Sequence, residues 1–131
     1  METTTGYDDS IRVAYISPDE QSRNRVKYYF ELSGHDPICL FHPDELQFLK
    51  EHESSLDVII FDSDDAQSEW NRALTKNKPL YDDAIYVVYS NNISMVEQMQ
   101  LMGFPALFKI AQENVLVDMV EGLYYYNMRG D

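Results

Sequence analysis

Short apolar segments alternate along the chain with segments of helical pattern, and this alternation restricts the fold more than any other feature. The apolar segments are residues 12–16, 38–41, 58–61, 84–89 and 107–110. Each has the length of a strand, and residues 58–61 are apolar throughout, as in strands that are buried on both faces. Strands that alternate with helices form a mainly parallel sheet covered by helices on both faces. We therefore predict an α/β fold of the doubly wound type.

Helical patterns lie between and after these segments. In the first interval Ser17 is expected to be the helix N-cap, with Pro18 at the first helical position and Glu20 completing a capping box. Gly34 is expected to end this helix, because glycine tolerates the left-handed conformation that follows a last helical turn. The other helices are predicted at about residues 43–50, 68–76, 94–102 and 113–127.

Length and composition are those of one folded domain with an excess of acid. The 131 residues are 44% hydrophobic, which is enough for one buried core. Acidic residues outnumber basic ones by 23 to 10, which gives a formal net charge of −13. This charge argues against direct contact with nucleic acid and favours basic partners. We expect residues 1–10 to be a disordered lead-in and residues 11–131 to form the domain.

The cysteine content and the hydropathy pattern indicate a cytoplasmic location. Cys39 is the only cysteine, so no intrachain disulfide can form, as is usual in a reducing compartment. No apolar run approaches the roughly 20 residues that a membrane-spanning helix needs. The polar N-terminus lacks the pattern of a signal peptide. We therefore expect no contact with a membrane.

Polar residues follow the ends of four predicted strands. Asp62, Asp64 and Asp65 come after the third strand, and Ser17, Ser90 and Lys109 lie at or near the ends of the first, fourth and fifth strands. In parallel α/β sheets, sites form beyond the carboxyl ends of the strands. A lysine is costly to bury without a partner, so an ion pair between Lys109 and Asp62 would satisfy both groups. Asp65 is assigned to a solvated loop.

Two other groups of residues carry weaker signals. The histidines His35, His42 and His52 lie in or beside predicted turns without ligand spacing, and we expect them at the surface. The run Tyr124-Tyr125-Tyr126 cannot turn every ring toward one core, so at least one ring is expected to be exposed.

Three separated motifs resemble the receiver domain of bacterial response regulators, the CheY-like superfamily. They are DVIIFD at residues 57–62, VVYS ending at Ser90 and ALFK ending at Lys109, and the resemblance extends from about residue 12 to residue 127. It implies a flavodoxin-like (βα)5 sheet of five parallel strands in the order 2-1-3-4-5. It also implies that Asp62 holds the phosphoacceptor position, and that Ser90 and Lys109 hold the positions that contact the phosphate.

The sequence departs from the receiver pattern where the metal ligands belong. Receivers carry two acids directly after the first strand, and the matching residues here are Ser17 and Pro18. Magnesium requires oxygen ligands, usually one or two carboxylates with water. Receivers also carry an aromatic residue at the position of Ala106 and a proline at the position of Ile110, and this chain has neither. We expect no bound metal or other cofactor; if Mg²⁺ is held, the candidate ligands are Asp19, Asp62 and Asp64.

These departures favour an atypical receiver, or pseudo-receiver. Such a domain is not an enzyme and would regulate a bacterial signalling or transcription-regulatory protein through protein contacts, without conventional Mg²⁺-dependent phosphorylation. The resemblance places the contacts, including a homodimer, on the fourth helix, the fifth strand and the fifth helix. It also implies an output domain in a longer parent protein. A histidine kinase is a further candidate partner.

Two alternatives remain open on the sequence. In the first, the domain accepts phosphate at Asp62 from a histidine kinase, and Asp19 or Glu20 helps to hold the metal. In the second, the pair Asp62 and Asp64 after an apolar strand is the nucleophile motif of a haloacid-dehalogenase-type phosphatase. That motif normally closes a first strand, whereas here it closes the third.

Overall fold

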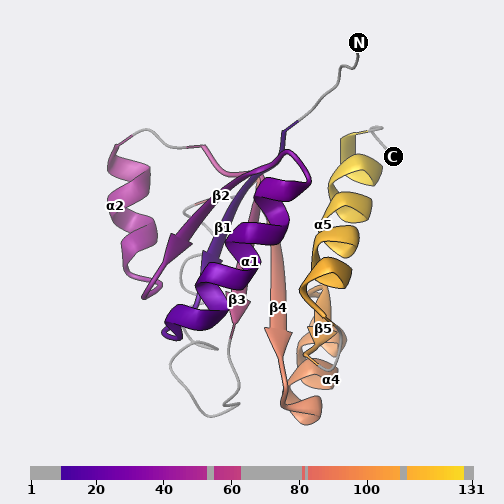
Figure 1. Cartoon of the computed structure of the whole chain (residues 1–131). Coiled ribbons are helices and arrows are strands. Elements are labelled where there is room, and N and C mark those ends of the chain that lie inside the picture. Colours follow the sequence, from indigo (N-terminus) through magenta and orange to yellow (C-terminus); the bar gives the residue numbers. More distant parts are fainter. Residues whose placement is uncertain (1–9, 53–54, 63–80, 82, 110–111, 129–131) are drawn as a thin grey trace.

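The sheet has five parallel strands in the order β2-β1-β3-β4-β5 (Figure 1). A computed structural model describes residues 10–52, 55–62, 81, 83–109 and 112–128. The strands are β1 (Arg12–Ile16), β2 (Asp36–Leu40), β3 (Val58–Asp62), β4 (Ile85–Ser90) and β5 (Ala106–Phe108). The predicted flavodoxin-like α/β fold and its strand order are therefore confirmed.

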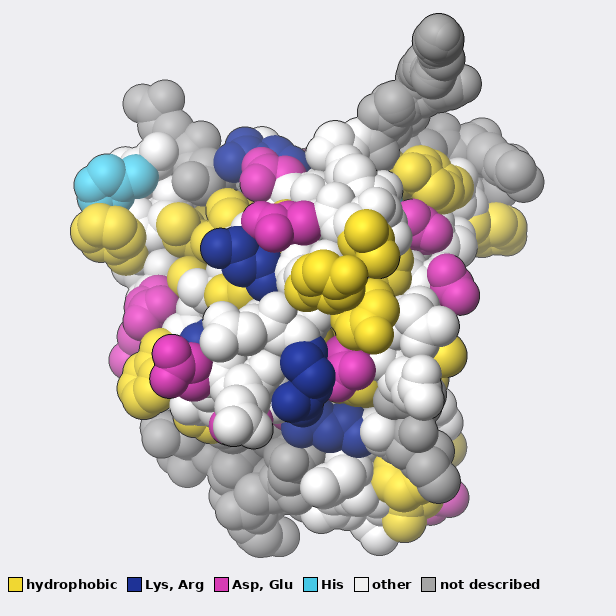
Figure 2. Space-filling model, in the orientation of Figure 1, with side chains coloured by type: hydrophobic (Ala, Val, Ile, Leu, Met, Phe, Trp, Pro, Cys, Tyr) yellow, Lys and Arg dark blue, Asp and Glu magenta, His cyan; other side chains and the backbone are white. Residues whose placement is uncertain are grey.

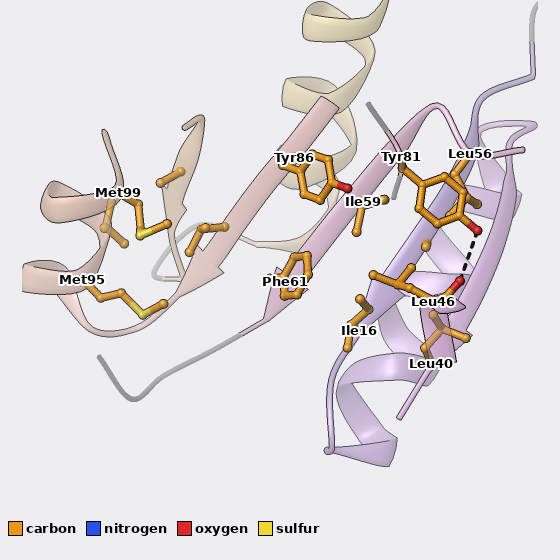
Figure 3. Packing of buried hydrophobic residues seen from close by; sticks show 14 residues of the cluster. Ile16, Leu40, Leu46, Leu56, Ile59, Phe61, Tyr81, Tyr86, Met95 and Met99 are labelled. Carbon is orange, nitrogen blue, oxygen red and sulfur yellow. Dashed lines mark hydrogen bonds between the residues drawn. The ribbon is translucent and has the colours of Figure 1, made fainter. Parts of the chain in front are cut away.

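The helices of the described residues lie on both faces of the sheet (Figure 1). One face packs against α1 (Glu20–Leu32) and α5 (Glu113–Met128), through core residues such as Phe30 and Leu116. The other face packs against α2 (Glu45–Glu51) and α4 (Ile93–Leu101), through Leu46, Met95 and Met99 (Figure 3). Successive side chains along each strand point to opposite faces and contribute to both cores, so the sheet is buried on both sides.

β3 is the central strand, and its five residues are all buried. Ile59 and Phe61 belong to the core beneath α2 and α4, whereas Val58 and Ile60 belong to the core beneath α1 and α5. This alternation assigns Asp62, the next residue of the second set, to the α1 and α5 face at the carboxyl end of the sheet. The site therefore begins where the most deeply buried strand ends.

The first helix starts later than the sequence predicted. Its N-cap is Asp19 rather than Ser17, and the Asp19 side chain accepts a hydrogen bond from the backbone N–H of Ser22. Ser17 instead continues the pairing of β1 with β2, because its backbone N–H donates a hydrogen bond to the carbonyl of Leu40 at 3.0 Å. The capping-box prediction for Ser17 and Glu20 was therefore wrong, because Ser17 completes the β1–β2 pairing.

Other element predictions differ by a few residues or cannot be compared. β5 covers residues 106–108 rather than 107–110, and α4 covers 93–101 rather than 94–102. Gly34 has a φ of 85°, which confirms its predicted place after the first helix. The helix predicted at residues 68–76 and the lead-in predicted at residues 1–10 fall on, or almost entirely on, residues outside the described ranges.

His35 is buried, which contradicts the expectation that all three histidines lie at the surface. Its Nδ1 atom accepts a hydrogen bond from the N–H of Ile11 at 3.1 Å, and its Nε2 atom lies 2.7 Å from the carboxylate of Glu121. Because Nδ1 is an acceptor, Nε2 carries the proton and donates it to Glu121. His35 thus links the entry to β1 with α5, a contact between residues 86 positions apart.

The outer side of the α1 and α5 layer is partly apolar. Figure 2 shows hydrophobic side chains gathered over α1, next to basic and acidic side chains. Tyr28 and Leu32 are exposed there, and Arg25 pairs with Glu113 of α5 at 3.0 Å. Tyr126 of α5 is 62% exposed, which confirms the expectation for the tyrosine run. Among the described residues, no helix has the length and hydropathy needed to span a membrane.

Candidate functional site

The carboxylate of Asp62 lies at the centre of the carboxyl edge of the sheet. Asp62 closes β3 and is only 4% exposed. The Nζ atom of Lys109, which follows β5, lies 2.5 Å from its Oδ1 atom. This geometry confirms the ion pair expected from the sequence. A carboxylate that is removed from water needs such a partner, because an isolated buried charge is costly.

The second carboxylate oxygen of Asp62 accepts a hydrogen bond from the Tyr15 hydroxyl. Strand pairing explains this contact. Tyr15 of β1 lies opposite Ile60 of β3, so Tyr15 and Asp62 share the α1 and α5 face, with Asp62 two residues further along its strand. A tyrosine ring that leans toward the carboxyl edge spans this offset, and its hydroxyl meets Oδ2 of Asp62.

The surroundings of Tyr15 keep its phenol protonated. Burial, the negative charge of Asp62 and the hydrogen bond to Asp62, in that order, hold the pKa of Tyr15 well above its ordinary value near 10. Tyr89, opposite Asp62 on β4, raises this pKa further, whereas a hydrogen bond with the Ser17 side chain lowers it. The net shift is upward, so Tyr15 remains a hydrogen-bond donor to Asp62 at neutral pH.

The residues after β1 direct their polar groups into local structure. Ser17 is 1% exposed, and its hydroxyl oxygen accepts a hydrogen bond from the N–H of Asp19 at 3.1 Å. The carboxylate of Asp19 accepts from both the N–H and the hydroxyl of Ser22. These bonds, that of the Ser22 hydroxyl first, lower the pKa of Asp19. Asp19 therefore acts as the N-cap of α1, and the hydrogen bonds of its carboxylate are made to Ser22 of that helix.

Ser90 and Lys109 are held next to each other by the backbone. Ser90 ends β4 with no exposed surface, and its carbonyl accepts a hydrogen bond from the Lys109 N–H at 2.7 Å. The Ser90 hydroxyl accepts from the N–H of Asn92 at 3.0 Å, close to the start of α4. The Lys109 ammonium also lies 5.7 Å from the centre of the Tyr89 ring, within cation–π range. Asp64, the remaining predicted site residue, lies outside the described residues.

The described residues of this site do not fit Mg²⁺. The ion needs near-octahedral oxygen ligands and usually one or two carboxylates. Both oxygens of Asp62 already contact a donor, from Lys109 and Tyr15. Asp19 is engaged by Ser22, and no three His, Cys, Asp or Glu side chains among the described residues lie close enough together to hold a metal.

Tyr15 is the site residue that reasoning from the sequence missed. It lies within the apolar segment RVAYI, and such a residue is normally assigned to the core. A signal was present, because a buried tyrosine hydroxyl usually has a hydrogen-bond partner. The partner could not be identified without the register between β1 and β3, which places Tyr15 and Asp62 on one face.

Several solved structures with a similar fold are receiver domains. A CheY-like receiver domain protein from Methanospirillum hungatei is 13% identical with a TM-score of 0.78, covering 94% of this chain and 100% of its own. A receiver domain protein from Clostridium thermocellum is 14% identical with a TM-score of 0.77, covering 92% and 99%. A Francisella receiver domain is 20% identical with a TM-score of 0.75, covering 90% and 99%. No protein-family model and no curated protein matches the sequence.

Proposed function

Because the chain has the fold of response-regulator receiver domains, we propose that it is an atypical receiver, a regulatory domain that works through protein contacts without conventional Mg²⁺-dependent phosphorylation. One observation carries this proposal. Asp62 holds the acceptor position, but its carboxylate is already paired with Lys109, and the residues after β1 supply no second carboxylate toward it.

The chemistry of phosphoryl transfer explains why this arrangement matters. Transfer to an aspartate requires positive charge around the phosphoryl oxygens, and a metal ion normally supplies part of it. Lys109 and Ser90 hold the positions for two of the phosphate contacts that the receiver resemblance implies. Ser17 and Pro18 take the places of the carboxylates that would hold the metal. Asp62 therefore stands at the acceptor position as one half of an ion pair, and the described residues supply no ligand set for the metal ion that would activate it.

The surface formed by α4, β5 and α5 is the proposed contact face for a protein partner. Leu101 and Met102, at the end of α4, are 89% and 56% exposed, and Val115 of α5 is 40% exposed. β5 is the edge strand of the sheet, and the Gln100 side chain caps its outward carbonyl at Ala106. An exposed apolar group beside a sheet edge is typical of an interaction surface.

Charge favours a basic partner over a second copy of the chain at this surface. The sequences of α4 and α5 contain acids, such as Glu97 and Asp118, and no lysine, arginine or histidine. Two identical copies would bring like charges together, which disfavours that pairing. A partner with basic and apolar side chains would complement both features. An output domain remains part of this proposal, whereas a histidine kinase belongs to the alternative in which Asp62 accepts phosphate.

The decisive experiment exposes the protein to Mg²⁺ with acetyl phosphate, and separately to Mg²⁺ with beryllofluoride, a phosphoryl mimic. We expect the amide NMR spectrum and the intact mass to remain unchanged. A receiver that keeps the acid pair after its first strand is the positive control. A saturable spectral shift centred on Asp62, lost in Asp62→Asn, would contradict the proposal and favour the phosphorylatable receiver. Hydrolysis of an aryl phosphate with Mg²⁺ would instead support the phosphatase alternative.

A further inference from the structure

We infer that the Tyr15 hydroxyl acts as an internal ligand of the Asp62 carboxylate and excludes a divalent cation from its Oδ2 atom. This inference rests on the proposed function, because it names the residue that keeps the acceptor position closed. The loss of the acid pair explains why a metal lacks ligands. The Tyr15 contact adds a separate obstacle, which would persist even if an acid were restored after β1.

The first support is the position of the hydroxyl. Tyr15 has no exposed surface, and its hydroxyl donates to Oδ2 while Lys109 occupies Oδ1. A cation that is coordinated by Asp62 through Oδ2 would have to displace this hydrogen bond. Hydrogen bonds to a charged acceptor are stronger than neutral ones, so the displacement carries a cost that adds to the dehydration of the metal.

The second support is that Tyr15 cannot easily move away. Its ring is packed in the core beneath α1 and α5, among residues such as Val26 and Phe30, and strand pairing fixes its backbone on both sides. Close packing of this kind leaves few alternative rotamers. The hydroxyl is therefore presented to Asp62 by the core itself, which makes Tyr15 a positioning residue for Asp62.

The third support is chemical. The Ser17 side chain, at a position where the receiver pattern places an acid, follows Tyr15 by two residues on the same face of the chain and lies close enough to the Tyr15 phenol to lower its pKa. A carboxylate at residue 17 would therefore contact the phenol before it could coordinate the same cation as Asp62. The neutral, protonated phenol also brings no positive charge, so it holds the carboxylate without acting as a substitute for the metal.

The test restores the missing acid and then removes the hydroxyl. Four proteins are compared: the wild type, Ser17→Asp, Ser17→Asp with Tyr15→Phe, and Ser17→Asp with Tyr86→Phe. The Tyr86 hydroxyl lies in the other core, beneath α2 and α4, and provides a matched control for the loss of a buried hydroxyl. Mg²⁺ alone is the probe, and binding is followed by the side-chain carboxylate ¹³C signal of Asp62. Thermal unfolding confirms that each variant is folded before titration.

We expect Ser17→Asp with Tyr15→Phe to bind Mg²⁺ about tenfold more tightly than Ser17→Asp, a factor on the scale of one hydrogen bond to a charged group. Ser17→Asp with Tyr86→Phe should match Ser17→Asp. The gain should disappear when Asp62→Asn is added. Equal affinity with and without the Tyr15 hydroxyl, or no binding by the Tyr15→Phe double variant at millimolar Mg²⁺, would overturn the inference. The wild-type arm reports separately on the proposed function, because Mg²⁺ binding there would count against that proposal whatever the Tyr15 comparison shows.

Discussion

The hydroxyl of Tyr15 and the carboxylate of Asp62, 47 positions apart in the chain, form a hydrogen bond at the carboxyl edge of the sheet. Their strands are neighbours, and strand alternation places both side chains on the face covered by α1 and α5. The bond joins a residue of the core to a residue of the candidate site. Changes to Tyr15 should therefore alter both the stability of the fold and the properties of Asp62.

The raised pKa of Tyr15 predicts a loss of stability at high pH. The folded state retains the phenol proton above the ordinary pKa near 10, whereas the unfolded chain releases it. The contribution of Tyr15 is thus complete below about pH 10 and falls as the pH rises, by up to about 1.4 kcal/mol per pH unit. Urea unfolding from pH 8 to 11 should show a shallower decline in Tyr15→Phe than in the wild type. A decline equal to that of the wild type would contradict the assignment.

Removal of the Lys109 charge should destabilise the fold strongly. Lys109→Met keeps the length of the side chain but leaves the buried Asp62 carboxylate without its cation, at a cost of about 3–5 kcal/mol. The double variant Lys109→Met with Asp62→Asn should recover most of this loss, because neither charge then remains. Chemical denaturation of the four members of this cycle gives the coupling energy. Additive effects would show that the ion pair contributes nothing beyond its separate parts.

Truncation of Met99 and truncation of Leu101, both near the end of α4, should differ in their effect on the free energy of unfolding. Met99 is 1% exposed in the core beneath α4, so Met99→Ala should cost about 2–5 kcal/mol through a cavity. Leu101 is 89% exposed, so Leu101→Ala should change the free energy of unfolding by no more than about 0.5 kcal/mol. Leu101→Ala should instead weaken binding of a basic partner. A large stability loss in Leu101→Ala would place that side chain in the core rather than at a contact surface.

The contacts of His35 should stabilise the start of β1 against α5. His35→Ala removes the acceptor for the Ile11 N–H and the donor to Glu121, leaving a buried N–H without its partner at a cost of about 1–3 kcal/mol. Hydrogen exchange at the Ile11 amide should accelerate in this variant. His52→Ala is the matched control, because His52 is exposed at the end of α2. Unchanged protection at Ile11 would show that the His35 contact does not secure the strand.

The order of the elements was predictable because it depends on local patterns. Apolar segments of strand length, separated by helical patterns, imply a parallel sheet, and the Asp62, Ser90 and Lys109 positions follow from where those segments end. The ion pair between Asp62 and Lys109 was also predictable, since both groups lie at strand ends and each needs a partner. Local pattern was less reliable at the start of α1, where Ser17 and Asp19 compete as caps.

The sequence by itself determined the class of fold and the edge of the sheet at which the site lies, because hydrophobic periodicity and turn residues act over short distances. Only the tertiary structure decided which side chains meet there. Tyr15 reaches Asp62 and His35 reaches Glu121 through strand register and helix packing, and neither contact joins neighbours in the chain. The same structure turned Asp19 into a helix cap rather than a partner of Asp62. The contact of Tyr15 with Asp62 is thus a property of packing between distant segments, which no local pattern encodes.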